Sequence, residues 1–367
     1  MKNRKMNIFQ TVLFAGLILG ISLCCWLKSP TEYSESERRN LDQLPELSIS
    51  TLTSGRFMTG FEDYTLDQFP YRDGFRKLKA AINLYIFGKL DNNKYYITDE
   101  GYIGKIEYPM KENMLLSAAK KFRYIYQSYL KDNNTNVFLS VILDKNAFMA
   151  GENGKLVMNY NDFFRIMKEN CEFAEYIDIS DLLSLDDYYA TDTHWRQESI
   201  KNIADRIAEN LGVVLVNDYE EKTLDKDFYG VYYGQSGFSA KPDRIKYLTN
   251  DAIENCIVYN LENNTQMTMY DMQKAYGNDP YEMFLSGSVS LIRIENPNAT
   301  TDKELVVFRD SFGSSLVPLL STGYKSITIV DIRYLSSAVL GKYIDFANKD
   351  VLFIYSTLVL NNSVALK

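Results

Sequence analysis

The chain has 367 residues, with 40 lysines and arginines against 48 aspartates and glutamates, and its net charge is −8. The first 28 residues hold four of the positive charges and none of the negative ones, which leaves 36 against 48 and a net charge of −12 for the remainder. Such an acidic balance argues against nucleic acid as a partner, because nucleic-acid-binding surfaces are basic. His194 is the single histidine, which excludes zinc sites built from two or three imidazoles of one chain. We expect neither a metal nor a cofactor.

An uncharged segment near the N-terminus runs from Ile8 to Leu27 and follows three basic residues. A helix of about 20 apolar residues matches the thickness of a bilayer's hydrocarbon core. The basic flank should remain cytoplasmic, which places everything after Lys28 outside the cell membrane. A cleaved signal peptide is the alternative, but the segment ends in Leu-Cys-Cys-Trp-Leu, without the small residues of a cleavage site. We therefore predict a cytoplasmic tip and a single-pass anchor at residues 1–28.

Residues 29–110 are expected to form a stalk and an N-terminal region of helices and a hairpin. Prolines and charges mark residues 29–50 as the stalk, and apolar residues then recur at helical spacing over residues 56–90. This helical pattern is interrupted at Pro70. Alternation of apolar and polar residues over 92–106 predicts a small β-hairpin.

Strands and helices alternate through residues 111–367, which predicts an α/β fold with a mostly parallel sheet and helices on both faces. The expected helices lie at 112–130, 162–170, 197–211 and from Gly313 to about Leu320, and the expected strands at 137–143, 176–179, 305–308, 326–332 and 351–355. Residues 213–280 have weaker periodicity and indicate an insertion or a β-rich excursion. Asp144, Ser311 and Asp331 each follow a predicted strand, so they should share the carboxyl edge of the sheet, where ligands bind.

Ser311 and His194 are the residues that suggest chemistry. Ser311 stands between a predicted strand and a predicted helix, so its hydroxyl should project from the sheet edge beside free backbone N–H groups. Acyl transfer needs such a serine, a base to deprotonate it and fixed donors for the oxyanion. Asp192, two residues before His194, is placed to orient the imidazole. The alternatives are a plain helix N-cap for the serine and a structural role for the histidine.

The segment Asp187–Trp195 reads Asp-Tyr-Tyr-Ala-Thr-Asp-Thr-His-Trp and resembles the signature of the DHHW family. Proteins of that family are similar to the periplasmic alginate O-acetylation proteins of the SGNH-hydrolase-like superfamily. Four further stretches resemble family motifs in the same order: Tyr33–Leu41 the stalk motif, Asp67–Asp73 the D-x-F-P-x-R-D segment, Leu143–Asn146 the P-D/S-K element, and Arg309–Phe312 the K/R-D-S-F/Y block. The resemblance covers nearly the whole chain after the predicted anchor.

The resemblance implies an SGNH-like fold in which Asp192, His194 and Ser311 form an Asp–His–Ser triad. Two positions depart from the family pattern. Thr193 replaces the usual histidine between the triad aspartate and histidine, and Leu143 stands where proline is common. Neither departure removes a member of the triad.

Four further residues are candidates for oxyanion or substrate contacts. The backbone N–H of Ser311 is the first expected oxyanion donor, and Gly287 and Ser288 are additional candidates, in a block where relatives often carry Gly-Asn. Lys145 follows a predicted strand and is placed to contact substrate, unless it faces solvent or forms an ion pair. Trp195 is placed to stack on a sugar, unless it packs beneath the histidine.

The function that follows from these residues is a membrane-anchored, extracytoplasmic serine acyl-transfer enzyme. The resemblance implies an O-acetyltransferase that acts on a secreted or cell-wall polysaccharide, together with a membrane partner that hands over acetyl groups. One alternative is a glycan O-acetyl esterase with the same triad. The other is a non-catalytic glycan-binding or assembly protein that kept the fold.

Overall fold

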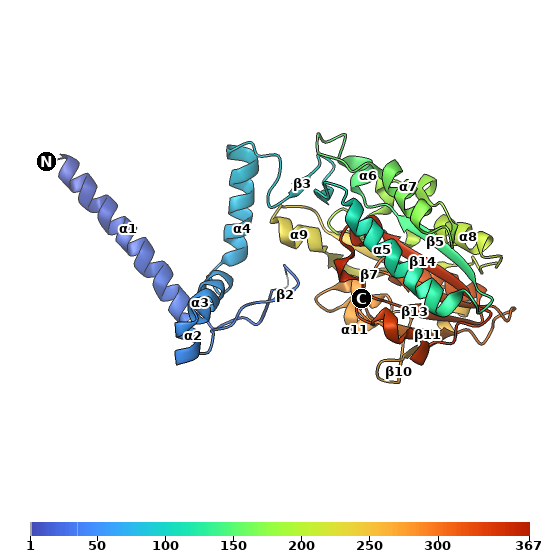
Figure 1. Ribbon diagram of the computed structural model, residues 1–367. Coiled ribbons are helices and arrows are strands. Elements are labelled where there is room, and N and C mark those ends of the chain that lie inside the picture. Colours follow the sequence, from blue (N-terminus) through green and yellow to red (C-terminus); the bar gives the residue numbers. More distant parts are fainter. Residues whose placement is uncertain (1, 35) are drawn as a thin grey trace. The chain divides into compact units, whose positions relative to one another are not determined.

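The computed structural model of the chain describes residues 2–34 and 36–367 (Figure 1). The described residues divide into two compact units. The N-terminal unit comprises the residues up to Asn93 together with Tyr233–Ser239, and the α/β unit comprises Lys94–Tyr232 and Ala240–Lys367. This division assigns the hairpin of β3 (Tyr95–Ile97) and β4 (Ile103–Lys105) to the α/β unit. The boundary expected at residue 110 stays a prediction.

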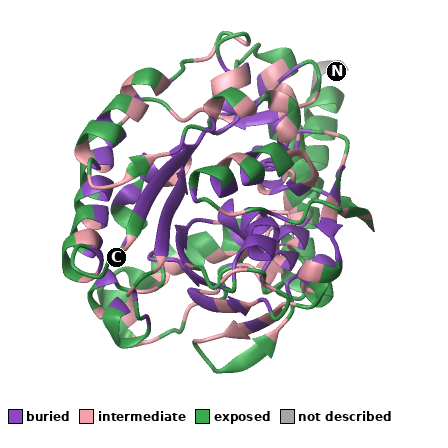
Figure 2. Cartoon of the chain, turned by 90° about the vertical axis from the view of Figure 1, so that its right-hand side faces the viewer, coloured by how far each residue is buried: buried purple, intermediate pink, exposed green. Residues whose placement is uncertain are grey.

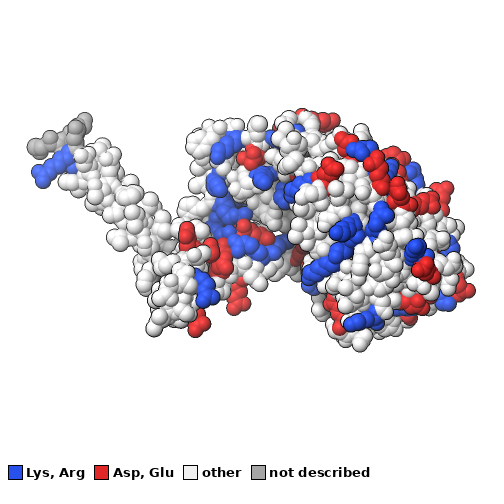
Figure 3. Space-filling view, viewed as in Figure 1, with Lys and Arg blue, Asp and Glu red and all other residues white. Residues whose placement is uncertain are grey.

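The N-terminal unit begins with α1 (Lys2–Leu27), which is long and apolar enough over Arg4–Leu27 to cross a membrane. Apart from the basic residues at its start, the helix carries no charged side chain along its visible length (Figure 3). A membrane anchor and a signal sequence both fit this length and composition.

The remainder of the N-terminal unit contains short helices and one small ladder. Its elements are β1 (Tyr33–Ser34), β2 (Arg39–Asn40), α2 (Ile49–Thr53), α3 (Arg56–Asp67), α4 (Arg72–Ala81) and a π-helical turn at Ile82–Ile86. The chain leaves the helical conformation around Pro70, as predicted, because proline lacks the N–H that an uninterrupted helix requires. Asp67 accepts a paired hydrogen bond from Arg39, at 2.7 and 2.5 Å, which ties the second strand to the end of α3.

The centre of the α/β unit is an eight-stranded sheet in the order β10-β9-β11-β13-β12-β14-β5-β6. Its strands are β5 (Asn136–Ile142), β6 (Glu175–Tyr176), β9 (Ile257–Asn260), β10 (Thr265–Met267), β11 (Leu291–Glu295), β12 (Glu304–Arg309), β13 (Ser326–Val330) and β14 (Asp350–Ser356). From β13 to β6 all neighbours are parallel, whereas β11, β9 and β10 continue the other edge as antiparallel strands. The predicted α/β class with a mostly parallel sheet is confirmed.

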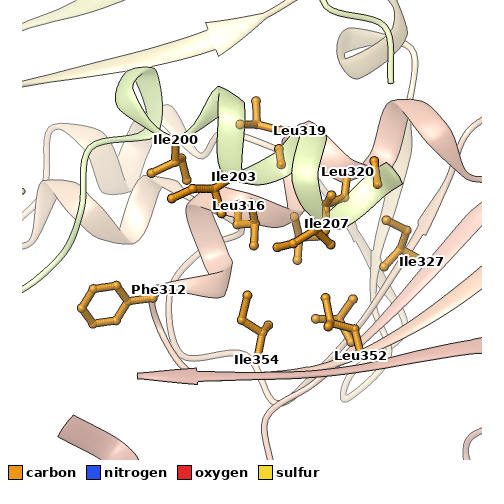
Figure 4. Close-up of a cluster of buried hydrophobic side chains, with 14 of the residues drawn as sticks. Ile200, Ile203, Ile207, Phe312, Leu316, Leu319, Leu320, Ile327, Leu352 and Ile354 are labelled. Atoms are coloured by element: carbon orange, nitrogen blue, oxygen red, sulfur yellow. The ribbon is translucent and has the colours of Figure 1, made fainter. Parts of the chain in front are cut away.

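Helices cover both faces of this sheet, because successive side chains of each strand point to opposite faces. Leu305 and Val307 of β12 pack in one buried cluster, and Val306 and Phe308 in the other. The first cluster includes residues of α8 (Lys201–Asn210) and α12 (Gly313–Leu320), and the second includes residues of α5 (Glu112–Ile125) and α7 (Tyr160–Asn170). Figure 4 shows α8 facing α12 over β14, and Figure 2 shows the buried strands surrounded by helices that are exposed on their outer sides.

The stretch 213–280 contains elements of two kinds. β7 (Glu220–Phe228) and β8 (Asp243–Thr249) form a separate antiparallel pair, while β9 and β10 join the central sheet. The α/β unit and its connections also contain short α-helices: α6 (Asn146–Met149), α9 (Val231–Ser236), α10 (Asp251–Glu254), α11 (Met272–Ala275) and α13 (Thr357–Leu360). Cys171 and Cys256 are both free thiols.

Candidate active site

The candidate site lies at the carboxyl edge of the parallel strands. Ser311 comes two residues after the end of β12, and α12 begins two residues later. Asp144 and Asp331 follow β5 and β13, which run parallel to the strands between them. The expectation that these three residues share one edge is therefore confirmed, because parallel strands end at the same edge.

The structure brings Asp192, His194 and Ser311 together across 117 positions of sequence. Nε2 of His194 lies 2.7 Å from Oγ of Ser311, and Nδ1 lies 2.6 Å from Oδ1 of Asp192. An ionised carboxylate only accepts hydrogen bonds, so we assign the proton of the neutral ring to Nδ1. Nε2 is then the free acceptor for the serine hydroxyl proton, which is the position of a general base.

Asp192 is fully buried, and backbone N–H groups hold both of its oxygens. Oδ1 accepts from the N–H of His194 at 3.1 Å, and Oδ2 accepts from the N–H of Val231 at 2.8 Å. A Cβ at Gly230 would collide with Cα and Cβ of Asp192, so glycine is required where this backbone passes the carboxylate. Sequence reasoning missed the part played by residues 230–231, since nothing local marks a contact 39 positions away.

Tyr281 is a second feature of the site that the sequence did not predict. Its ring stacks on the imidazole of His194, with centroids 3.9 Å apart and planes 9° from parallel. Its hydroxyl is 2.9 Å from Oγ of Ser315 and donates to the carbonyl of Ser311 at 3.3 Å. The aromatic face is positioned for a cation–π contact with the imidazolium that proton transfer from the serine would generate.

Trp195 is fully buried, which corrects the expectation that it offers a face to a sugar. Its indole N–H donates to the carbonyl of Phe312 at 3.1 Å and to Oγ of Ser315 at 2.9 Å. The tryptophan therefore fastens the segment that carries His194 to the turn that carries Ser311. Trp195 thus has a packing role next to His194, which was the alternative to sugar stacking.

Lys145 is also buried, with 1% of its surface exposed, so a direct contact with substrate is excluded. Its Nζ donates to the backbone carbonyls of Tyr189, Ala190 and Asp192 at 3.0, 3.1 and 2.6 Å. Burial lowers the pKa of Lys145 to about 7, although the nearby carboxylates oppose that shift. The lysine thus contacts the backbone of the segment that carries Asp192 and His194, and it does not reach the solvent-exposed face of the candidate site.

The predicted oxyanion donors differ in availability. The N–H of Gly287 donates to the carbonyl of Phe284 at 3.3 Å, within a turn whose three residues from Leu285 onward have φ of 54, 55 and 77°. Because this N–H is already hydrogen-bonded, the expectation that Gly287 offers a free oxyanion donor is corrected. Ser288 is exposed. The N–H of Phe312 is occupied by Oδ1 of Asp310 at 3.0 Å. The N–H of Ser311 stays the expected donor.

Arg309 and Asp310 fix the turn that presents the serine. Oδ2 of Asp310 accepts from both the N–H and the hydroxyl of Ser356, each at 2.7 Å. Arg309 is fully buried and pairs with Asp331 at 3.2 Å. Over the described residues, no group of three or more histidine, cysteine or acidic side chains has the arrangement of a metal site.

No family model matches the sequence, and no curated protein matches it either. Among solved structures, a DHHW family protein from Eubacterium siraeum is 19% identical at a TM-score of 0.61, covering 74% of this chain and 92% of that one. Bacillus cereus PatB1 with a sulfonyl adduct is 20% identical at a TM-score of 0.59, covering 73% and 97%; PatB1 itself is 18% identical at 0.56, covering 72% and 96%. The chain thus has the fold of a DHHW family protein and of PatB1, in agreement with the resemblance found in its sequence.

Proposed function

We propose that the chain is a membrane-anchored, extracytoplasmic serine acyl-transfer enzyme, and that it O-acetylates a secreted or cell-wall polysaccharide. The observation that carries this proposal is the hydrogen-bonded series from Ser311 through His194 to Asp192, at the edge of the sheet where ligands bind. The stacked ring of Tyr281 adds support, because it is positioned for a cation–π contact with the imidazolium that forms in the reaction.

The reaction runs in two balanced halves. His194 Nε2 takes the proton of Ser311 as Oγ attacks the carbonyl carbon of an acetyl donor, and the tetrahedral oxyanion faces the N–H of Ser311. Collapse breaks the bond to the leaving group, which receives the proton from His194. A sugar hydroxyl then gives its proton to His194 and attacks the acetyl-serine, and the collapse of that intermediate returns the proton to Ser311.

The location and the partners belong to the same proposal. We assign α1 the role of an uncleaved single-pass anchor, with the α/β unit outside the membrane, because the basic residues precede the apolar span. The polysaccharide acceptor and a membrane partner that supplies acetyl groups follow from the family resemblance. A sulfonyl adduct is described for PatB1, so we expect a sulfonyl fluoride to label this chain at Ser311.

The test is to compare Ser311→Ala with wild type for turnover of para-nitrophenyl acetate by the full-length protein. Ser117→Ala is the matched control, because Ser117 is an exposed serine on α5. We expect turnover to vanish only in Ser311→Ala, and mass spectrometry to locate an acetyl or sulfonyl adduct on the Ser311 peptide. Equal turnover in the two variants, or an adduct elsewhere, would refute the mechanism.

A glycan O-acetyl esterase uses the same residues with water as acceptor, and the partial exposure of Ser311 is compatible with water access. Acetate release is therefore to be measured with and without an added oligosaccharide. A transferase forms acetylated oligosaccharide at the expense of acetate, whereas an esterase releases acetate at the same rate in both cases. If neither product forms, the non-catalytic glycan-binding alternative takes precedence.

A further inference from the structure

The loop that carries Asp192 and His194 has no regular secondary structure of its own. A single antiparallel bridge between Tyr188 and Trp195 closes it, together with a hydrogen bond of 3.1 Å from the N–H of Tyr189 to the carbonyl of His194. The loop backbone sets the positions of both side chains. Its rigidity must therefore come from groups outside the loop.

Lys145 holds the carbonyl groups of this loop. It follows β5, the strand next to the edge strand β6, and its ammonium has three N–H donors for the three carbonyls within 3.1 Å, those of Tyr189, Ala190 and Asp192. Every donor of the charged form is therefore used. The ring of Tyr232 lies 5.0 Å from Nζ and adds a cation–π contact.

Asp243 holds the amide groups of the same loop. Its Oδ1 accepts from the N–H of Ala190 at 2.9 Å. Its Oδ2 accepts from the N–H of Thr191 at 2.8 Å and from the hydroxyl of Thr191 at 2.6 Å. Asp243 begins β8, so a strand of the 213–280 stretch supplies this contact.

We propose that Lys145 and Asp243 form a charged clamp on the backbone of residues 189–192, and that this clamp positions Asp192 and His194 for proton transfer. Both are positioning residues, since neither touches the reacting atoms. The clamp's catalytic consequence rests on the proposed function, whereas its effect on the His194 ring does not. Burying two charges is costly, and well-packed apolar residues are often as stable in such places. We therefore infer that the two charged side chains serve to fix the conformation of the loop and not to raise the stability of the fold.

The clamp has a defined dependence on pH. The charged groups that face Lys145 are Asp192, Asp243, Arg196 and Asp144, and burial brings the pKa of the lysine to about 7 despite the three carboxylates. A neutral amine has only two N–H donors, so deprotonation removes one of the three hydrogen bonds from Nζ. The carbonyl of Ala190 also accepts from the N–H of Ile103 at 2.8 Å, whereas the lysine is the donor that we assign to the carbonyls of Tyr189 and Asp192. The clamp is complete below pH about 7 and loosens above it.

The single histidine allows a direct test that does not depend on acyl transfer. In full-length protein labelled with ¹⁵N-histidine, every imidazole signal belongs to His194. We expect a low-field Nδ1 proton in wild type that shifts or broadens as pH rises through about 7. Lys145→Met and Asp243→Asn should show the disturbed signal at all pH values, and Lys120→Met, which removes an exposed lysine, should not.

The same variants are compared for turnover of the acetyl ester. A misplacement of about 1 Å is enough to lower kcat/KM ~100-fold, and we expect this loss in Lys145→Met together with loss of the lysine-dependent fall at alkaline pH. A purely structural lysine would lower the melting temperature without changing the pH profile of the folded protein. Wild-type signals and kcat/KM in both clamp variants would overturn the proposal. If the variants do not fold, the wild-type pH titration decides, since a signal that stays unchanged over the whole range from pH about 7 to 10.5, within which the lysine loses its proton, refutes the clamp.

The two proposals fail separately. If neither the wild type nor Ser311→Ala turns over the ester, the proposed function fails. The imidazole signals of His194 then still test whether the clamp positions the ring. If turnover depends on Ser311 while the clamp variants behave as wild type, the clamp fails alone.

Discussion

Replacing Asp192 by asparagine removes one charge and one acceptor from a fully buried position. Three N–H groups converge on the carboxylate, those of His194 Nδ1, the His194 backbone and Val231. An amide has one oxygen and one NH₂ group, so it cannot accept from both sides. With its oxygen toward His194, its NH₂ opposes the N–H of Val231 and leaves buried donors unpaired, at a cost of about 1–3 kcal/mol in unfolding free energy.

The other orientation of the amide has a catalytic consequence. With its NH₂ toward Nδ1, the stable ring tautomer carries its proton on Nε2, where the proton of Ser311 must be received. The corresponding change in Ser-His-Asp triads lowers kcat ~10⁴-fold, which is about 5 kcal/mol of transition-state stabilisation. We expect Asp192→Asn to lose kcat by this order for an acetyl ester, with little change in KM.

The assay is steady-state turnover by the full-length protein, combined with thermal unfolding to exclude misfolding. Asp186→Asn is the control. Asp186 is an exposed aspartate six residues before Asp192, and its hydrogen-bond partner is Tyr102, which is not a member of the candidate triad. A folded Asp192→Asn protein whose kcat stays within about tenfold of wild type would contradict the tautomer argument, since the loss expected from it is far larger.

Three further predictions concern residues around the site. Tyr281→Phe keeps the stacked ring and should retain most activity, whereas Tyr281→Leu removes the cation–π contribution of about 1 kcal/mol and should lower kcat/KM roughly fivefold. Arg309→Met leaves Asp331 without one buried partner and should lower the unfolding free energy in urea by about 3 kcal/mol, the lower end for such pairs because Arg333 still contacts Asp331. The unfolded chain retains the Lys145 proton between pH about 7 and 10.5, where the folded chain has lost it, so this lysine makes unfolding free energy rise with pH in that window. Lys145→Met should remove that part of the rise in urea titrations at several pH values.

The positions of the parallel strands along the chain and the three residues of the candidate triad were accessible from the sequence. Buried parallel strands read as continuous apolar runs, and polar residues that follow such runs meet at one edge. Asp192, His194 and Ser311 also stand in segments that resemble family motifs. Each of these signals is local, within a few residues of the position it identifies.

Contacts between distant segments were not accessible in this way. The stacking of Tyr281 on His194 and the approach of Asp243 to Thr191 depend on where irregular chain segments cross, and no periodicity records that. The burial of Lys145 was also not accessible, because residue type alone favours a solvent position for lysine. The antiparallel strand β11 went unassigned, since it has only five residues between irregular segments.

The path of the chain between Gly230 and Asp243 has a practical consequence for producing a shortened form of this protein. That path leaves the α/β unit beside Asp192 and returns at the clamp, and its middle part, Tyr233–Ser239, belongs to the N-terminal unit. Within the latter, Arg76 donates to the carbonyl of Gly234 at 2.9 Å. A truncated protein that starts after Asn93 lacks this arginine. The carbonyl of Gly234 then loses a hydrogen bond, and Gly234 lies only three residues after Val231, whose N–H binds Asp192. Activity lost in a protein that starts after Asn93 is therefore not by itself evidence against the proposed chemistry.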